Sequence, residues 1–300
     1  MSDSFGDRIK KYELQESGRR FIPLLPVCAR LDGKNFSNFT KGLCRPYDEI
    51  FSRLMIDTTK YLVEETCACI GYTQSDEISL VYYSDKADSQ IFFDGRIQKI
   101  VSVLASMCTI KFNQLLQNTY VTVLEKLKNY LDGDNIPHYL TIWNEKRKLL
   151  PVFDCRAWIV PTQIEACNTL LWREIDATKN SISMAASEYY SDKQLFEKNS
   201  SEKQEMLFQK GVNWDQYPSH FKRGTYIQRR KNISLFTTEE IKKLPPKHEA
   251  RTNPNLMIER TEVRELEMPP LNRVINKIGV IFNGEEPKEE NQMEKIKIIK

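Results

Sequence analysis

The order of hydrophobic patterns predicts a mixed α+β fold (α/β mixed) built on an antiparallel sheet. Up to residue 160 of the 300, the patterns read strand, helix, strand, strand, helix, strand. This order is typical of the ferredoxin-like fold, whose strands lie in the order 4-1-3-2 with helices on one face. A chain of this length can hold such a domain together with an extension.

Each of the four strands is predicted from an apolar or alternating run near turn residues. These runs lie at 27–31, 67–73, 77–83 and 151–160. Two helices between them are predicted from apolar residues at helical spacing, one at about 48–66 capped by Asp48 and one following Gly95. A short amphipathic helix at 5–16 precedes the first strand.

The rest of the chain is less regular in its pattern. We interpret 117–148 as an insertion and expect a long helix at 163–190. Further expectations are a helix at 201–208 capped by Ser201, a basic strand at 221–230, a strand at 279–282 and a mobile end from Pro287. We therefore expect a catalytic domain over 1–230 and a C-terminal extension, 231–300, that packs on it with a flexible end.

Three carboxylates are expected to meet at one end of the sheet. Strands one and three are antiparallel neighbours, so Asp32 at the end of the first lies beside Asp76 and Glu77 at the start of the third. Converging carboxylates repel one another, and a pair of Mg²⁺ ions would neutralise them. Two ions about 3.5–4 Å apart activate an attacking hydroxyl and hold a leaving phosphate. The alternative is that Asp32 and Asp76 are ordinary turn residues.

Basic residues favour a substrate that carries phosphate. Arg30 shares a strand face with Asp32, and Gly33 would let a phosphate approach the backbone. Arg96 and Lys99 share a face at a helix N-terminus, which favours anions. These residues indicate a triphosphate site, with a solvated basic turn as the alternative.

The segment 221–230 interleaves aromatic and basic residues. It begins Phe221-Lys222-Arg223-Gly224 and ends with Arg229 and Arg230. This composition suits a nucleic-acid backbone. The alternative is a charged edge strand that resists aggregation.

Composition excludes several other classes of protein. The net charge of +3 leaves the partner open, and no apolar run approaches the roughly 20 residues that span a bilayer. Seven cysteines without a CxxC pair give little support to a zinc site, and the three histidines lie near no plausible nucleophile. We expect a cytoplasmic protein with no membrane partner, since the first twenty residues hold no signal-peptide core.

Several ordered motifs resemble those of the tRNA-histidine guanylyltransferase-like family. The stretch 30–36, RLDGKNF, is similar to the family motif RxDGxxF, and 74–79, QSDEIS, is similar to its QSDE motif. Weaker matches are Trp172-Arg173 with Asp176, the FKRG of 221–224, the N-terminal segment with Gly6, Asp7, Arg8, Lys10, Tyr12 and Glu13, and the tail at 261–286.

The resemblance implies a polymerase palm that works in the 3′–5′ direction on tRNA. The implied catalytic residues are Asp32, Asp76 and Glu77, which with Gly33 would bind two Mg²⁺ ions. Positions that match nucleotide-binding residues are Arg30, Lys34, Asn35, Phe36, Ser75, Arg96 and Lys99. Positions expected to contact RNA are Arg8, Lys10, Arg173, Asn180, Lys222 and Arg223. The implied partners are tRNA, ATP, GTP and other NTPs, and the implied assembly is a homotetramer, a dimer of dimers.

One block departs from the eukaryotic pattern. Where eukaryotic guanylyltransferases carry a DCHINN-like block, residues 176–181 read DATKNS, with Thr178 at the histidine position. This version resembles the "like proteins" associated with template-dependent repair of truncated tRNA 5′ ends. We expect template-dependent 3′–5′ addition after 5′ activation with ATP or GTP. Alternatives are addition of a single G to tRNA-His and, more distantly, a nucleotidyl cyclase or a non-catalytic RNA-binding palm.

Overall fold

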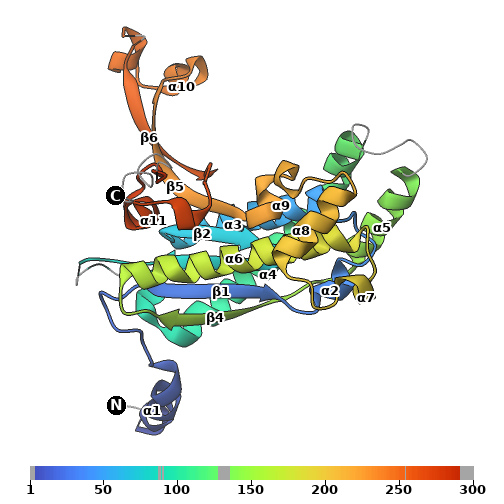
Figure 1. Cartoon of the computed structure of the whole chain (residues 1–300). Helices are drawn as coiled ribbons and strands as arrows, with labels where there is room; N and C mark the ends of the chain where they lie inside the picture. The colour runs from blue at the N-terminus through green and yellow to red at the C-terminus, as the bar shows by residue number, and fades with distance from the viewer. Residues whose placement is uncertain (1–3, 87–88, 90, 128–135, 254, 291–300) are drawn as a thin grey trace, which may run out of the picture.

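The computed structural model describes residues 4–86, 89, 91–127, 136–253 and 255–290. At its centre lies an antiparallel sheet with the strand order β4-β1-β3-β2-β5-β6 (Figure 1). The predicted order 4-1-3-2 is confirmed for the first four strands, and two later strands extend the sheet. The strands are β1 Val27–Gly33, β2 Ile70–Gln74, β3 Glu77–Tyr82, β4 Phe153–Ile159, β5 Thr225–Leu235 and β6 Met257–Glu265.

Helices cover both faces of this sheet, so the prediction of helices on one face only was wrong, because the long helix that follows the fourth strand packs on the other face. The two helices of the ferredoxin-like pattern, α3 (Glu49–Thr66) and α4 (Ile97–Leu127), share one core with Leu31 and Ile78. The long helix α6 (Gln163–Ser187) packs on the opposite face, over Cys28 and Val81 (Figure 1). The remaining α-helices are α1 Ser4–Ser17, α2 Phe36–Phe39, α5 Ile136–Lys148, α7 Asp192–Leu195, α8 Ser200–Gln209, α9 Ser219–Arg223, α10 Thr238–Lys243 and α11 Lys277–Asn283.

The α+β class is confirmed, and so is the cap of α3. The Asp48 carboxylate accepts hydrogen bonds from the backbone N–H groups of Ile50 and Phe51, at 3.0 Å each. It also accepts one from the Tyr139 hydroxyl of α5. This last bond joins α5 to the core, and the described parts of 117–148 are regular helix rather than irregular chain. The first part of this segment continues α4 and its last part forms α5.

Three other local predictions were wrong. The cap of α8 is Asn199, whose side chain accepts from Glu202 N, because the capping box lies two residues earlier than Ser201. Residues 221–223 end the short helix α9, and the strand begins only at Thr225. Residues 279–282 belong to α11 rather than to a strand, because a four-residue apolar run carries no period that separates the two.

The C-terminal segment is part of the same body as the sheet. The boundary expected at residue 230 falls inside β5, and β6 pairs with β5 from Met257 to Glu265. Residues 287–290 are not a free end, since Glu289 forms a β-bridge with Val274. The rest of the end that we expected to be mobile, 291–300, lies outside the described residues. Among the described helices, none is both long and apolar enough to cross a membrane.

Glu174 of α6 is the buried link between this helix, β5 and the C-terminal segment. One carboxylate oxygen accepts from the Tyr226 hydroxyl at 2.8 Å, and the other from Leu271 N at 2.9 Å. Burial raises the pKa of Glu174, and these two hydrogen bonds oppose the rise. The carboxylate therefore costs stability when charged but satisfies two buried donors.

Glu174→Gln should change how stability depends on pH. Because its folded pKa is raised, the stability that the Glu174 carboxyl contributes is fully present below the ordinary pKa of about 4.3. This contribution is lost as pH rises through the folded pKa. The amide cannot titrate, so thermal melts between about pH 4 and 7 should show the variant gaining on the wild type as pH rises. Melting temperatures of the variant and the wild type that change in parallel across this pH range would contradict the raised pKa of Glu174. As a control, Glu174→Ala should lose about 1–3 kcal/mol near pH 4, because it leaves buried donors unpaired, and this loss should shrink as pH rises because alanine cannot titrate either.

Candidate active site

The register between β1 and β3 brings the predicted carboxylates together. Asp32 lies directly opposite Glu77 in the antiparallel pair. The next peptide makes a hydrogen bond from Gly33 N to the Asp76 carbonyl at 3.1 Å. The predicted meeting of Asp32, Asp76 and Glu77 at one end of the sheet is confirmed. Directly opposed residues share a face, so Asp32 and Glu77 lie on the side covered by α6.

A close packing contact fixes the chain just after Asp32. A Cβ on Gly33 would lie 2.3 Å from the Phe36 ring, so no larger residue fits there without moving that ring. Phe36 is 3% exposed, and its ring centroid lies 4.9 Å from that of Phe153. The predicted role of Phe36 in nucleotide binding is therefore wrong for its side chain, which packs in the hydrophobic core.

Exposed polar residues flank the two aspartates. Ser75 (φ +48°) and Asn35 (φ +59°) both adopt the left-handed backbone conformation, which is uncommon for residues other than glycine. The Ser75 hydroxyl donates to Asp76 Oδ1 at 3.0 Å. Lys34 is exposed beside Asn35, and its backbone N–H donates to the Val152 carbonyl. These residues adjoin the carboxylates as predicted, and their contacts with a nucleotide stay a prediction.

The electrostatics of this edge favour a bound cation. Burial raises the pKa of Asp76, and the nearby charge of Asp32 raises it further, against hydrogen bonds that lower it. Burial also raises the pKa of Glu77, although Arg173 acts strongly in the other direction. A positive charge between Asp32 and Asp76 would relieve their repulsion.

The two oxygens of Glu77 are held by a single arginine. Arg173 Nε donates to Oε1 and Nη2 to Oε2, both at 2.7 Å, and Nη2 also donates to Asp176 at 3.0 Å. Arg173 is only 8% exposed. Its predicted contact with RNA is therefore corrected, because its guanidinium is enclosed by protein carboxylates. In this arrangement Glu77 anchors α6 to the sheet, and its predicted role as a metal ligand and catalytic residue stays a prediction.

The remaining oxygen donors fit Mg²⁺. Within the described part of the chain, no group of three or more His, Cys, Asp or Glu side chains is placed to hold a metal. Mg²⁺ usually binds one or two protein carboxylates and takes its other ligands from water and substrate phosphates. Asp32 and Asp76 meet this requirement, and the carbonyl of Gly33, the residue after Asp32, is a further oxygen donor.

Two further residues lie at this edge, Asp154, which went unpredicted, and Trp172, which was noted only as part of a motif. Asp154 of β4 lies directly opposite Asp32 on the other side of β1, so Glu77, Asp32 and Asp154 form one row across three strands. The ring of Trp172 lies 4.5 Å from the Arg173 guanidinium and 5.9 Å from that of Arg30. The strand order and the antiparallel register together would have been enough to place Asp154 beside Asp32.

Arg30 stays near the carboxylates, but two other predicted cations do not. Arg30 Nε lies 4.0 Å from Glu77 Oε2 and, within the part of the chain described, is buried without a hydrogen-bond partner. Arg96 and Lys99 lie at the start of α4, whereas Thr109, further along that helix, bonds to Phe153 next to the carboxylate edge. At about 1.5 Å per residue, this puts Lys99 roughly 15 Å along the helix from that level. Arg96 and Lys99 instead line a cavity of about 640 Å³ beside α1.

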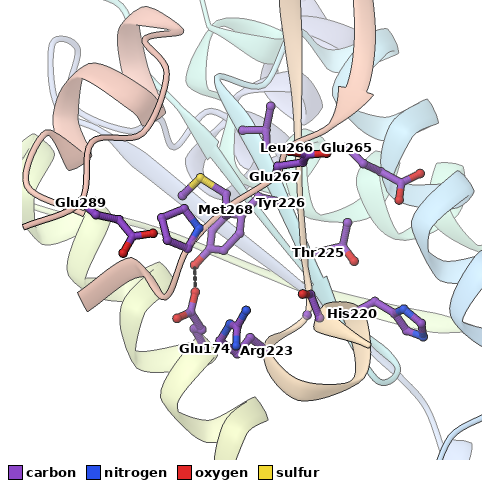
Figure 2. Close-up of a pocket in the computed structure, with 13 residues that line it drawn as sticks. Glu174, His220, Arg223, Thr225, Tyr226, Glu265, Leu266, Glu267, Met268 and Glu289 are labelled. Atoms are coloured by element: carbon purple, nitrogen blue, oxygen red, sulfur yellow. Dashed lines mark hydrogen bonds between the residues drawn. The ribbon is translucent and has the colours of Figure 1, made fainter. Parts of the chain in front are cut away.

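The residues predicted to contact RNA are dispersed. Arg8 and Lys10 are exposed on α1, and Asn180 is exposed on α6. Lys222 is buried and donates to the Asp215 carbonyl, so its side chain is not available to RNA and that prediction is corrected. Arg223 lines a cavity of about 750 Å³ together with Glu174 and Tyr226, as Figure 2 shows.

An antiparallel sheet that presents paired aspartates beside an arginine is the arrangement of a palm-type nucleotidyltransferase. The family model for tRNAHis guanylyltransferase matches residues 6–161, which is more than half of the chain. The chain belongs to this family, and it is therefore a nucleotidyltransferase that adds nucleotides to tRNA.

Solved structures and curated relatives agree with this assignment. A bacterial tRNA(His) guanylyltransferase-like protein in complex with ATP is 36% identical, with a TM-score of 0.63, covering 75% of this chain and 88% of that one. Another such structure, in complex with GTP, is 30% identical with a TM-score of 0.64, covering 90% and 94%. The tRNA(His) guanylyltransferase of Saccharomyces cerevisiae is 28% identical, over 78% of this chain and 93% of the yeast protein.

Arg173→Ala should destabilise the protein by about 3–5 kcal/mol, because it leaves the buried Glu77 without its partner. Arg173→Lys restores the charge but not the two parallel hydrogen bonds, so it should recover only part of this loss. Chemical denaturation measures both. If Arg173→Ala unfolds at the wild-type denaturant concentration, the ion pair does not anchor α6. The double variant Glu77→Gln/Arg173→Ala serves as the control and should be more stable than Arg173→Ala alone.

Proposed function

We propose that this protein extends the 5′ end of truncated tRNA in the 3′–5′ direction, with a template selecting each nucleotide. The observation that carries the nucleotidyl-transfer chemistry is the position of Asp32 and Asp76 at one sheet edge. The template-dependent mode rests on separate support, which comes from α6 and from the relatives.

The proposed cofactor is a pair of Mg²⁺ ions held by Asp32, Asp76 and the Gly33 carbonyl. When bound, the ions would lower the pKa of the attacking hydroxyl and hold the triphosphate. Asp32 and Asp76 supply two of the oxygens and their mutual repulsion supplies the preference for a cation. Glu77 contributes by holding Arg173, and thereby Trp172 and α6, against the edge.

The cations and polar groups of the edge are proposed to position the nucleotide. Arg30 offers its unpartnered Nε to a phosphate. Lys34, Asn35 and Ser75 lie beside the aspartates and are exposed. The 5′ end of the tRNA would first be activated with ATP or GTP, after which the 3′-hydroxyl of the incoming nucleotide attacks it. The two bacterial relatives with bound ATP and GTP support nucleotides as partners.

Thr178 supports the template-dependent mode. Its hydroxyl donates to the Glu174 carbonyl one turn earlier at 2.9 Å, so this position is a helix-bound hydroxyl where eukaryotic members carry a histidine. The bacterial guanylyltransferase-like proteins also share 36% and 30% identity with this chain, against 28% for the yeast enzyme. A homotetrameric assembly and a cytoplasmic location belong to the same proposal.

Asp32→Asn and Asp76→Asn should each reduce nucleotide addition by at least about 1,000-fold, because each removes a carboxylate from the proposed metal pair. Single-turnover addition to 5′-labelled tRNA measures this loss. Both variants should fold normally, because each substitution removes a negative charge from a pair of carboxylates that repel each other. Asp154→Asn is the matched control and should lose far less. Activity within a factor of ten of the wild type in either Asp32→Asn or Asp76→Asn would remove the two-metal assignment.

The templated mode is tested with a tRNA that lacks its first nucleotide, supplied with ATP, Mg²⁺ and one NTP at a time. We expect extension only by the nucleotide complementary to the opposing base. Changing that opposing base should change the nucleotide accepted. Addition of G whatever the opposing base, and only to tRNA-His, would establish the single-G activity instead.

A further inference from the structure

A second group of arginines lies at the end of the sheet away from the aspartates. It borders a cavity of about 360 Å³ between β5, β6 and the end of α11. The residues that matter here are Arg230, Arg264, Gly284 and Glu286. The position of this cavity along the sheet follows from Gln228, which lies opposite Arg264 in the pairing of β5 with β6. The Gln228 side chain donates to the carbonyls of Cys69 and Val280. Cys69 precedes Gln74 by five residues, so the cavity lies roughly 17 Å along the strand from the carboxylate edge.

Arg230 is built into the wall of this cavity. Its side chain is only 4% exposed. Nη1 and Nη2 donate to the carbonyls of Gly284 and Glu285, which fixes the plane of the guanidinium. Nε is buried and, among the described residues, has no hydrogen-bond partner. Burial and the neighbouring Arg264 both lower the pKa of Arg230, so an anion at this position would be stabilising.

Glu286 already places an anion between the two arginines. Its Oε1 lies 3.0 Å from Arg264 Nη2 and 3.5 Å from Arg230 Nη1. The Glu286 side chain is 72% exposed, whereas Arg264 is 47% exposed and Arg230 is buried. Arg230 is therefore held by the fold, while half-exposed Arg264 and the more exposed Glu286 carboxylate meet it from the solvent side. An exposed carboxylate of this kind is weakly held and readily exchanged.

We propose that Arg230 and Arg264 form a phosphate-binding site whose place Glu286 occupies until a phosphate displaces it. Two converging guanidinium groups match the geometry and charge of a phosphate better than those of one carboxylate, because phosphate offers more acceptor oxygens. The phosphate could come from an RNA backbone or from a free polyphosphate. The site is separate from the carboxylate edge, and it rests on the proposed function only in the choice of tRNA as a probe.

The test is the binding of two probes, fluorescent tRNA and inorganic triphosphate, measured by anisotropy and calorimetry without divalent cations. Glu286→Gln frees the two arginines, so it should tighten binding of at least one probe by about threefold or more. Glu145→Gln is the matched control, since Glu145 pairs with Lys148 on α5 at 2.6 Å, outside the lining of this cavity, and should leave both affinities unchanged. Arg264→Ala should weaken the probe that Glu286→Gln tightens. If that probe is tRNA, its salt dependence should fall by about one phosphate contact.

Each outcome is decisive. Tighter binding of tRNA alone assigns the site to an RNA phosphate, and tighter binding of triphosphate assigns it to a free polyphosphate. Unchanged or weaker binding of both probes by a Glu286→Gln protein with a normal thermal melt would overturn the proposal, leaving the ion pairs purely structural. Because no nucleotide addition is measured, a failure here is distinguishable from a failure of the proposed activity.

Discussion

The candidate active site depends on one constraint, the antiparallel register of β1 against β3. A slip of one residue in this pairing would turn every side chain of the strand to the other face. The register is set by the buried residues of both strands, since Leu31 and Ile78 must face α3 and α4. Asp32 and Glu77 then face α6, and the turn before Glu77 brings Asp76 alongside. The hydrophobic core thus fixes the geometry of the charged edge.

The second element on which the site depends is the ion pair between Arg173 and Glu77. It crosses from α6 to the sheet, and both of its side chains are largely buried. A buried pair of this kind is weak evidence for net stability but strong evidence for a defined position. The same α6 also carries Glu174, which holds β5 and the C-terminal segment through Tyr226 and Leu271. Two adjacent residues of one helix therefore join the catalytic edge to the extension of the sheet.

Much of the central fold could be predicted because its signals are local and periodic. The strand and helix patterns up to residue 160 gave the order 4-1-3-2, and that order placed Asp32 beside Glu77. The errors fall where local pattern carries little information. The apolar run at 279–282 is too short to distinguish a helix from a strand. The main partner of Arg173, Glu77, is remote in sequence, and the burial of Lys222 depends on tertiary packing. Phe36 shows the same limit, since a motif position does not reveal whether a side chain faces the substrate or the core.

We propose that Asp32 and Asp76 together create a site for two divalent cations. The most direct measurement is a Mn²⁺ titration followed by electron paramagnetic resonance, with a non-hydrolysable ATP analogue bound. We expect two bound ions in the wild type and the loss of at least one in Asp76→Asn. Asp154→Asn should bind the same number of ions as the wild type. Two ions retained in Asp76→Asn at wild-type affinity would contradict this proposal.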